Sequence, residues 1–234
     1  MGKITLFCIP SAGMSAVTYN NWRAYLSEDI DLYPVELAAR GIRFRDNIYS
    51  NFDEAVNDVF GQVKDIVKEK PYAFFGHCMG SWIACEVCQK IRTAGYDKPN
   101  HIFFSGKQPP HIADEKDLHI LPDNEFINEI LFMGGTSKEI FEDENLLSLF
   151  MPVLRNDFKI VESYIYTPYN CKLDCDISVL YGKENKRMIK IAAEWEMYTN
   201  KNCYLYGFEG NQFFIHGEMR KVLDIVNYSL INTK

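Results

Sequence analysis

Short apolar runs alternate with helical repeats along most of the chain. In the clearest helix, residues 52–67, apolar side chains recur every three or four positions. Further helices are predicted at 81–94, 188–199 and 217–231, and strands at 3–9, 30–36, 72–75, 101–105, 177–181 and 203–208. Strands that alternate with helices are typical of a mainly parallel sheet with helices on both faces, so we predict the α/β class.

The stretch 107–168 interrupts this alternation. It carries three helix-like pieces, at 123–133, 138–150 and 152–166, and no convincing strand. An all-helical insertion between two strands of a sheet is a candidate lid over an active site. We therefore predict a single domain over residues 1–234, with a helical lid inserted at 107–168.

Composition is that of an ordinary globular protein. The chain has 234 residues, of which 47% are hydrophobic and 24% charged, and this excludes a disordered or low-complexity chain. A net charge of −7 argues against a nucleic-acid partner, and no apolar run reaches the roughly 18 residues of a membrane span. Seven cysteines, an odd number, favour the reducing cytoplasm. Their spacing suits neither a redox nor a zinc site, so we predict no metal and no other cofactor.

The segment Gly76-His77-Cys78-Met79-Gly80 joins a fully apolar strand to the next helix. Glycine–x–nucleophile–x–glycine in this setting predicts a nucleophile elbow, a tight turn that exposes the middle side chain. The start of the helix places N–H donors and the positive end of the helix dipole beside that residue, which favours a developing anion. Cys78 is therefore the candidate nucleophile. The alternative is a tight strand–helix turn with a buried cysteine.

Together with this turn, several further segments resemble type II thioesterases, the stand-alone enzymes of non-ribosomal peptide and polyketide assembly lines. The segments are 7–13 (FCIPSAG), 38–43 (AARGIR), 76–80 (GHCMG), 105–110 (SGKQPP), 121–123 (LPD), 133–135 (MGG) and 152–158 (PVLRNDF). The resemblance covers nearly the whole chain and implies an α/β-hydrolase fold. It also implies an oxyanion hole made by the backbone N–H groups of Ala12 and Met79, and an acyl or peptidyl carrier protein as partner.

The chain departs from this family at all three positions of the catalytic triad. Where the family has Ser, Asp and His, this sequence has Cys78, Asn185 and Gln212. Asparagine can orient an imidazole, but glutamine cannot accept and return a proton near neutral pH. His216 follows Gln212 by four residues and could replace the missing base if the loop shifts by one turn. The alternative is a solvated histidine at the start of a helix.

A cysteine can be acylated without that base. Its unperturbed pKa of about 8.5 leaves a few per cent thiolate at pH 7, and attack on a thioester exchanges one thiol for another. Removal of the acyl group by water would be slow, because that step needs a base. We therefore expect acyl transfer through an acyl-enzyme on Cys78 rather than efficient hydrolysis. Two alternatives remain: an editing hydrolase that uses His216, and a non-catalytic protein that binds acyl groups or carrier proteins.

Three arginines lie close together in the sequence, at Arg40, Arg43 and Arg45. In the family this segment lies near the entrance of the site. The cluster could therefore bind the phosphate of a phosphopantetheine arm or the acidic face of a carrier protein. Ordinary surface ion pairing is the alternative. We also expect the lid to cover Cys78 and to leave a channel long enough for a pantetheine arm.

Overall fold

A single six-stranded sheet forms the centre of the computed structural model, which describes residues 2–113 and 117–231. All neighbouring strands are parallel, and their order is β2-β1-β3-β4-β5-β6. This confirms the predicted α/β class, and each predicted strand is present. The strands are β1 (Ile4–Ile9), β2 (Ile30–Pro34), β3 (Tyr72–His77), β4 (His101–Ser105), β5 (Asp176–Gly182) and β6 (Cys203–Phe208).

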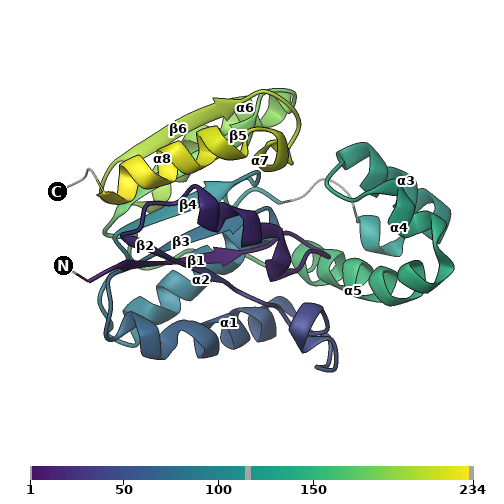
Figure 1. The fold of residues 1–234 in the computed structure, drawn as a ribbon, viewed down its shortest axis with the longest axis horizontal. Helices are drawn as coiled ribbons and strands as arrows, with labels where there is room; N and C mark the ends of the chain where they lie inside the picture. Colours follow the sequence, from purple (N-terminus) through teal and green to yellow (C-terminus); the bar gives the residue numbers. More distant parts are fainter. Residues whose placement is uncertain (1, 114–116, 232–234) are drawn as a thin grey trace.

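Helices cover both faces of the sheet (Figure 1). One face packs against α1 (Phe52–Val67) and α2 (Met79–Thr93), and the other against the 3-10 helix Ala16–Ala24 and α8 (Met219–Ile231). Each face has its own hydrophobic core, because the central strands are apolar on both sides. The shorter elements are α6 (Lys186–Ile191), α7 (Phe214–Gly217) and the 3-10 helices Gly41–Arg43, Leu118–Ile120 and Ala192–Tyr198. Of these, Leu118–Ile120 packs with the inserted helices described next.

The inserted helices form a separate group to one side of the sheet (Figure 1). They are α3 (Asp123–Met133), α4 (Lys138–Glu142) and α5 (Glu144–Glu162), and they share a small apolar core of their own. We call the stretch 107–168 the lid. None of the helices in the described ranges is long and apolar enough to cross a membrane.

Two predicted helix boundaries are wrong. The break expected before Pro152 lies at Asp143, whose side chain caps α5 by accepting the backbone N–H groups of Asn145 and Leu146, and α5 continues through Pro152. The helix expected at 188–199 divides at Ala192 into α6 and a 3-10 helix. This 3-10 helix carries Trp195, whose ring is buried and stacks on Phe104 at 3.9 Å between centroids. Tertiary packing of Trp195 thus overrides the local pattern at the second boundary, whereas the cap at Asp143 is itself a local signal that sets the first.

Candidate active site

Cys78 occupies the sharp turn between β3 and α2. Its backbone has φ 51° and ψ −118°, a conformation that costs a non-glycine residue energy. The flanking glycines allow the turn to be this tight: a Cβ on Gly76 would lie 2.2 Å from the carbonyl oxygen of Gly80. A Cβ on Gly80 would lie equally close to the carbonyl oxygen of Ile9. The turn therefore has the geometry that the glycine pattern predicts, with a partly exposed cysteine at its tip.

The pocket in front of Cys78 is small. Its volume is about 20 Å³, room for roughly one water molecule. Four apolar lid residues close it from above, namely Ile130, Met133, Leu154 and Phe158. The expected covering of Cys78 by the lid is thus seen, but the expected channel for a pantetheine arm is not open, because these side chains fill the space.

The two backbone groups proposed for the oxyanion hole come from the loop after β1 and from the turn that carries Cys78. Ala12 lines the pocket, and Met79 is the first residue of α2. In the described part of the chain, neither of their N–H groups donates a hydrogen bond to another protein group. Both are therefore available to an oxygen atom placed next to Cys78, as an oxyanion hole requires.

The other two triad positions differ in where the structure places them. Gln212 lines the pocket with Cys78, and its Nε2 lies 3.9 Å from Met133 Sδ. Asn185 does not line the pocket, and its side-chain oxygen accepts the N–H of Met188 at 3.0 Å, capping α6. The structure thus brings Gln212, but not Asn185, to the candidate nucleophile.

His216 does not line this pocket. It lies on α7 with an exposed side chain, and its ring is parallel to that of Phe213, with centroids 6.3 Å apart. Partial loss of hydration lowers the pKa of His216. Among the described residues that line the Cys78 pocket, none is a histidine, aspartate, glutamate or lysine. A general base is therefore not in place in this conformation.

His77, next to the nucleophile, points into the protein interior. Its Nδ1 lies 3.0 Å from Ser105 Oγ, and Phe213 and Phe214 pack edge-on against its ring. Burial, assisted by nearby His216, lowers the pKa of His77 to about 3. The imidazole is therefore neutral at physiological pH, and its contacts are those of a packed interior side chain.

Arg40 is buried, contrary to the predicted docking cluster. Its guanidinium donates to both carboxylate oxygens of Asp157 on α5, at 2.5 and 2.9 Å. Burial alone lowers the pKa of a guanidinium, but the Asp157 carboxylate raises that of Arg40 above its usual value. Asp157 also accepts the N–H of Gly13 at 2.7 Å. This Arg40–Asp157–Gly13 clamp ties the lid to the loop that carries Ala12.

The remaining two arginines have different surroundings. Arg43 is engaged by Asp58 at 2.6 Å and by Asp46 at 2.8 Å, so its charge is largely compensated. Arg45 is exposed and packs over the ring of Phe44 at 5.3 Å. In the described part of the chain it forms no ion pair. Of the predicted cluster, Arg45 is therefore the residue available to a partner.

Comparison with known proteins decides the family. A family model described as a thioesterase domain matches residues 4–230. The chain belongs to the thioesterase family. The fold and its relatives place this thioesterase among the type II thioesterases of non-ribosomal peptide and polyketide pathways.

Two solved structures and one sequence relative illustrate the similarity. ClbQ, from the colibactin NRPS/PKS pathway, is 32% identical with a TM-score of 0.91 over 99% of this chain and 98% of its own. The type II thioesterase BorB, from the borrelidin cluster, is 28% identical with a TM-score of 0.87 over 97% and 93%. The protein named linear gramicidin dehydrogenase LgrE, from Brevibacillus parabrevis, is 31% identical over 97% of this thioesterase and 88% of its own length.

Proposed function

We propose that this thioesterase takes acyl or aminoacyl groups from carrier-protein thioesters onto Cys78 and passes them to a second thiol or amine more readily than to water. The observation that carries the proposal is the composition of the pocket. Cys78 lies at the start of α2, next to Gln212, and the described lining holds no residue that could serve as a general base near pH 7.

The first step forms one thioester and breaks another. The Cys78 thiolate attacks the substrate carbonyl carbon, and the negative charge on the oxygen is stabilised by the N–H groups of Ala12 and Met79. The pantetheine sulfur then leaves as a thiolate and takes up a proton from solvent. In the second step an acceptor thiolate or neutral amine attacks the carbonyl carbon of the acyl-cysteine. The bond between that carbon and the Cys78 sulfur breaks, Cys78 leaves as a thiolate, and an amine acceptor loses its extra proton to solvent.

One experiment separates this function from the two alternatives. The purified protein is incubated with an acyl-carrier thioester, and both the intact mass and the free acid are followed. A stable mass increase on Cys78, transferred when an acceptor thiol is added, supports acyl transfer. Continuous release of free acid that His216→Ala removes supports hydrolysis with His216 as base. Neither signal, with the carrier still bound, supports a binding protein.

The double variant Gln212→His/Asn185→Asp is expected to convert a persistent acyl-enzyme into a hydrolase. Histidine at 212 would place a base in the pocket beside Cys78, and aspartate at 185 can still cap α6. Gain of a general base typically changes a rate by about 10²–10⁴-fold, so release of free acid should rise by at least about tenfold. Single-turnover assays measure this rate. Unchanged release by the folded double variant would show that the missing imidazole is not what limits deacylation.

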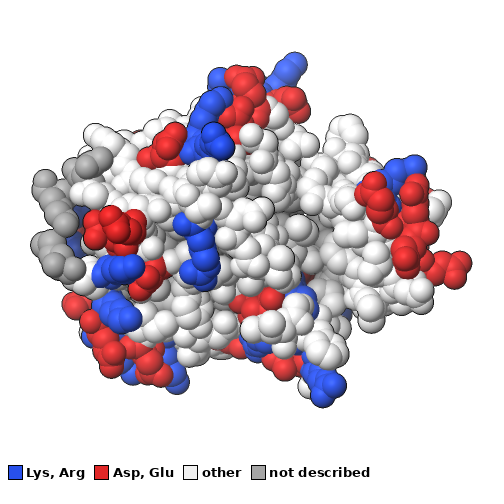
Figure 2. Space-filling view, in the orientation of Figure 1, with Lys and Arg blue, Asp and Glu red and all other residues white. Residues whose placement is uncertain are grey.

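Arg45→Glu is expected to weaken the use of carrier-bound substrates selectively. Arg45 is exposed in a segment with the apolar side chains of Ile42 and Phe44, whereas acidic side chains gather on the outer end of the lid (Figure 2). An acidic carrier protein should therefore dock at the 41–48 segment rather than on that end of the lid. We expect KM for a carrier substrate to rise about two- to fivefold at low salt.

A matched control is Arg220→Glu, because Arg220 is also exposed and lies over an aromatic ring, Tyr25, at 5.1 Å. Arg220→Glu should leave KM for the carrier substrate unchanged. Small-molecule thioesters should be used equally well by both variants. An equal loss on small and carrier-bound thioesters would reject docking at Arg45.

A further inference from the structure

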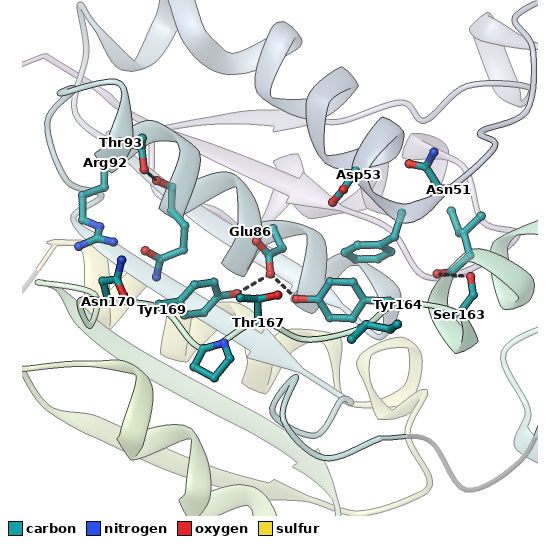
Figure 3. A pocket seen from close by; sticks show the side chains of 15 residues that line it. Asn51, Asp53, Glu86, Arg92, Thr93, Ser163, Tyr164, Thr167, Tyr169 and Asn170 are labelled. Carbon is teal, nitrogen blue, oxygen red and sulfur yellow. Dashed lines mark hydrogen bonds between the residues drawn. The ribbon is translucent and has the colours of Figure 1, made fainter.

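A second cavity lies away from Cys78 and shares none of the residues that line the first pocket. Its volume is about 540 Å³, which is within the usual range for sites that bind small molecules. The start of α1, the second half of α2, the end of α5 and the segment 163–170 surround it (Figure 3). The cavity therefore lies between α2, the helix that begins next to Cys78, and the end of α5, the longest lid helix.

Gln89 gives this cavity an unsatisfied hydrogen-bonding group. It lines the cavity and is 7% exposed, yet within the described residues neither Nε2 nor Oε1 of its side chain has a hydrogen-bond partner. A buried amide without partners is costly, and such groups are rare in folded proteins. An amide offers one donor group and one acceptor, so the best complement is another amide.

Two charged residues flank Gln89 on the same face of α2. Glu86, Gln89 and Arg92 are spaced by three residues, and all three line the cavity. At a rise of about 1.5 Å per residue, Glu86 and Arg92 are roughly 9 Å apart along the helix axis. This row of an acid, an amide and a cation on the protein is complementary to a ligand that carries an amine, an amide and a carboxylate in the same order.

The two ends of this row have capacity to bind a ligand. Oε1 of Glu86 accepts hydrogen bonds from the hydroxyls of Tyr164 and Tyr169, which hold the carboxylate in place (Figure 3). Its Oε2 accepts none from the described residues. At the other end, Arg92 is exposed and, within those same residues, forms no ion pair. Asp53 adds a further negative charge to the lining.

We propose that this cavity binds a short peptide of about three residues, with its amino group at Glu86, an internal amide at Gln89 and its carboxylate at Arg92. An extended tripeptide spans about 10 Å, which suits the roughly 9 Å between the two charged residues. The proposal is independent of the reaction at Cys78, because it rests on a different set of side chains.

Isothermal titration calorimetry of the full chain with trialanine tests this assignment. We expect saturable binding, which Gln89→Leu weakens by about tenfold or more, since the peptide amide then loses its partners. Gln89→Leu should also fold with an unchanged or higher Tm, because it removes an unsatisfied buried amide. The control Lys90→Ala, a neighbour on α2 that does not line the cavity, should bind as the unmodified protein does.

A second pair of measurements tests the orientation of the peptide. Arg92→Ala removes an exposed side chain and should not disturb folding. Arg92→Ala should lower the affinity for trialanine by about the same factor as C-terminal amidation of the peptide lowers its affinity for the unmodified protein. The affinity of the amidated peptide should not fall further when Arg92 is replaced by alanine. Absence of binding heat, or equal affinity for the unmodified and Gln89→Leu proteins, would overturn the proposal.

Discussion

Cys78→Ser is expected to abolish formation of the acyl-enzyme. A serine hydroxyl needs a base to be a nucleophile at neutral pH, because its alkoxide population is negligible beside that of a thiolate. The pocket provides no such base: His216 is exposed outside it, and His77 is buried against Ser105. We expect the rate of acylation to fall by about 10²-fold or more. The measurement is the intact mass of the protein after incubation with an acyl-carrier thioester.

The matched control for this prediction is Cys171→Ser, because Cys171 has an exposed thiol outside the pocket. The Cys171→Ser protein should be acylated on Cys78 at the same rate as the unmodified protein. Comparable acylation of Cys78→Ser would mean that a base reaches the pocket in solution, and the proposed preference for transfer over hydrolysis would then fail. If Cys78→Ser still gains the mass of an acyl group and the double variant Cys78→Ser/Cys171→Ser does not, Cys171 is the acylated group.

Asp157→Asn is expected to destabilise the protein strongly. The substitution leaves the buried guanidinium of Arg40 without a counter-charge and offers one acceptor oxygen in place of two. Breaking a buried ion pair by removing one partner typically costs about 3–5 kcal/mol of unfolding free energy. For a chain of this size, that corresponds to a Tm lower by about 6–20 °C. Thermal unfolding followed by circular dichroism measures the change.

The same substitution should also slow acylation below the new Tm. Asp157 accepts the N–H of Gly13, next to Ala12, so its loss should loosen one half of the proposed oxyanion hole. Asp123→Asn is the control: its carboxylate is 79% exposed and pairs with Arg155, so we expect a change within about 1 kcal/mol. A folded Asp157→Asn protein with an unchanged Tm would show that the Arg40–Asp157–Gly13 clamp does not stabilise the fold.

Local patterns in the sequence were sufficient to predict the sheet and the turn at Cys78. Helix α1 matches its predicted range because its apolar residues repeat with one period and Asn51 caps its start. The turn is likewise predictable, since Gly76 and Gly80 each contact backbone that no side chain could approach. These features depend on residues that lie near one another in the chain.

Pairings between distant residues could not be predicted in this way. Arg40 and Asp157 are 117 positions apart, and proximity in the sequence suggested that Arg40 belongs with Arg43 and Arg45. Both partners lie in segments that resemble the family, 38–43 and 152–158, and this joint occurrence is the signal that could have suggested their pairing. The closing of the pocket by Met133 and Leu154 depends on tertiary packing of the lid, which no local pattern encodes.

The filled space in front of Cys78 has a consequence for affinity. With about 20 Å³ in the pocket, an acyl group can enter only those molecules in which the lid has moved away from Ala12 and Cys78. The apparent dissociation constant for an acyl group in this pocket then equals the intrinsic constant divided by the population of that open state. Affinity for every substrate is therefore scaled by one conformational equilibrium. Because the closed state admits no acyl group, acyl chains of different length are discriminated only by how tightly each binds the open state.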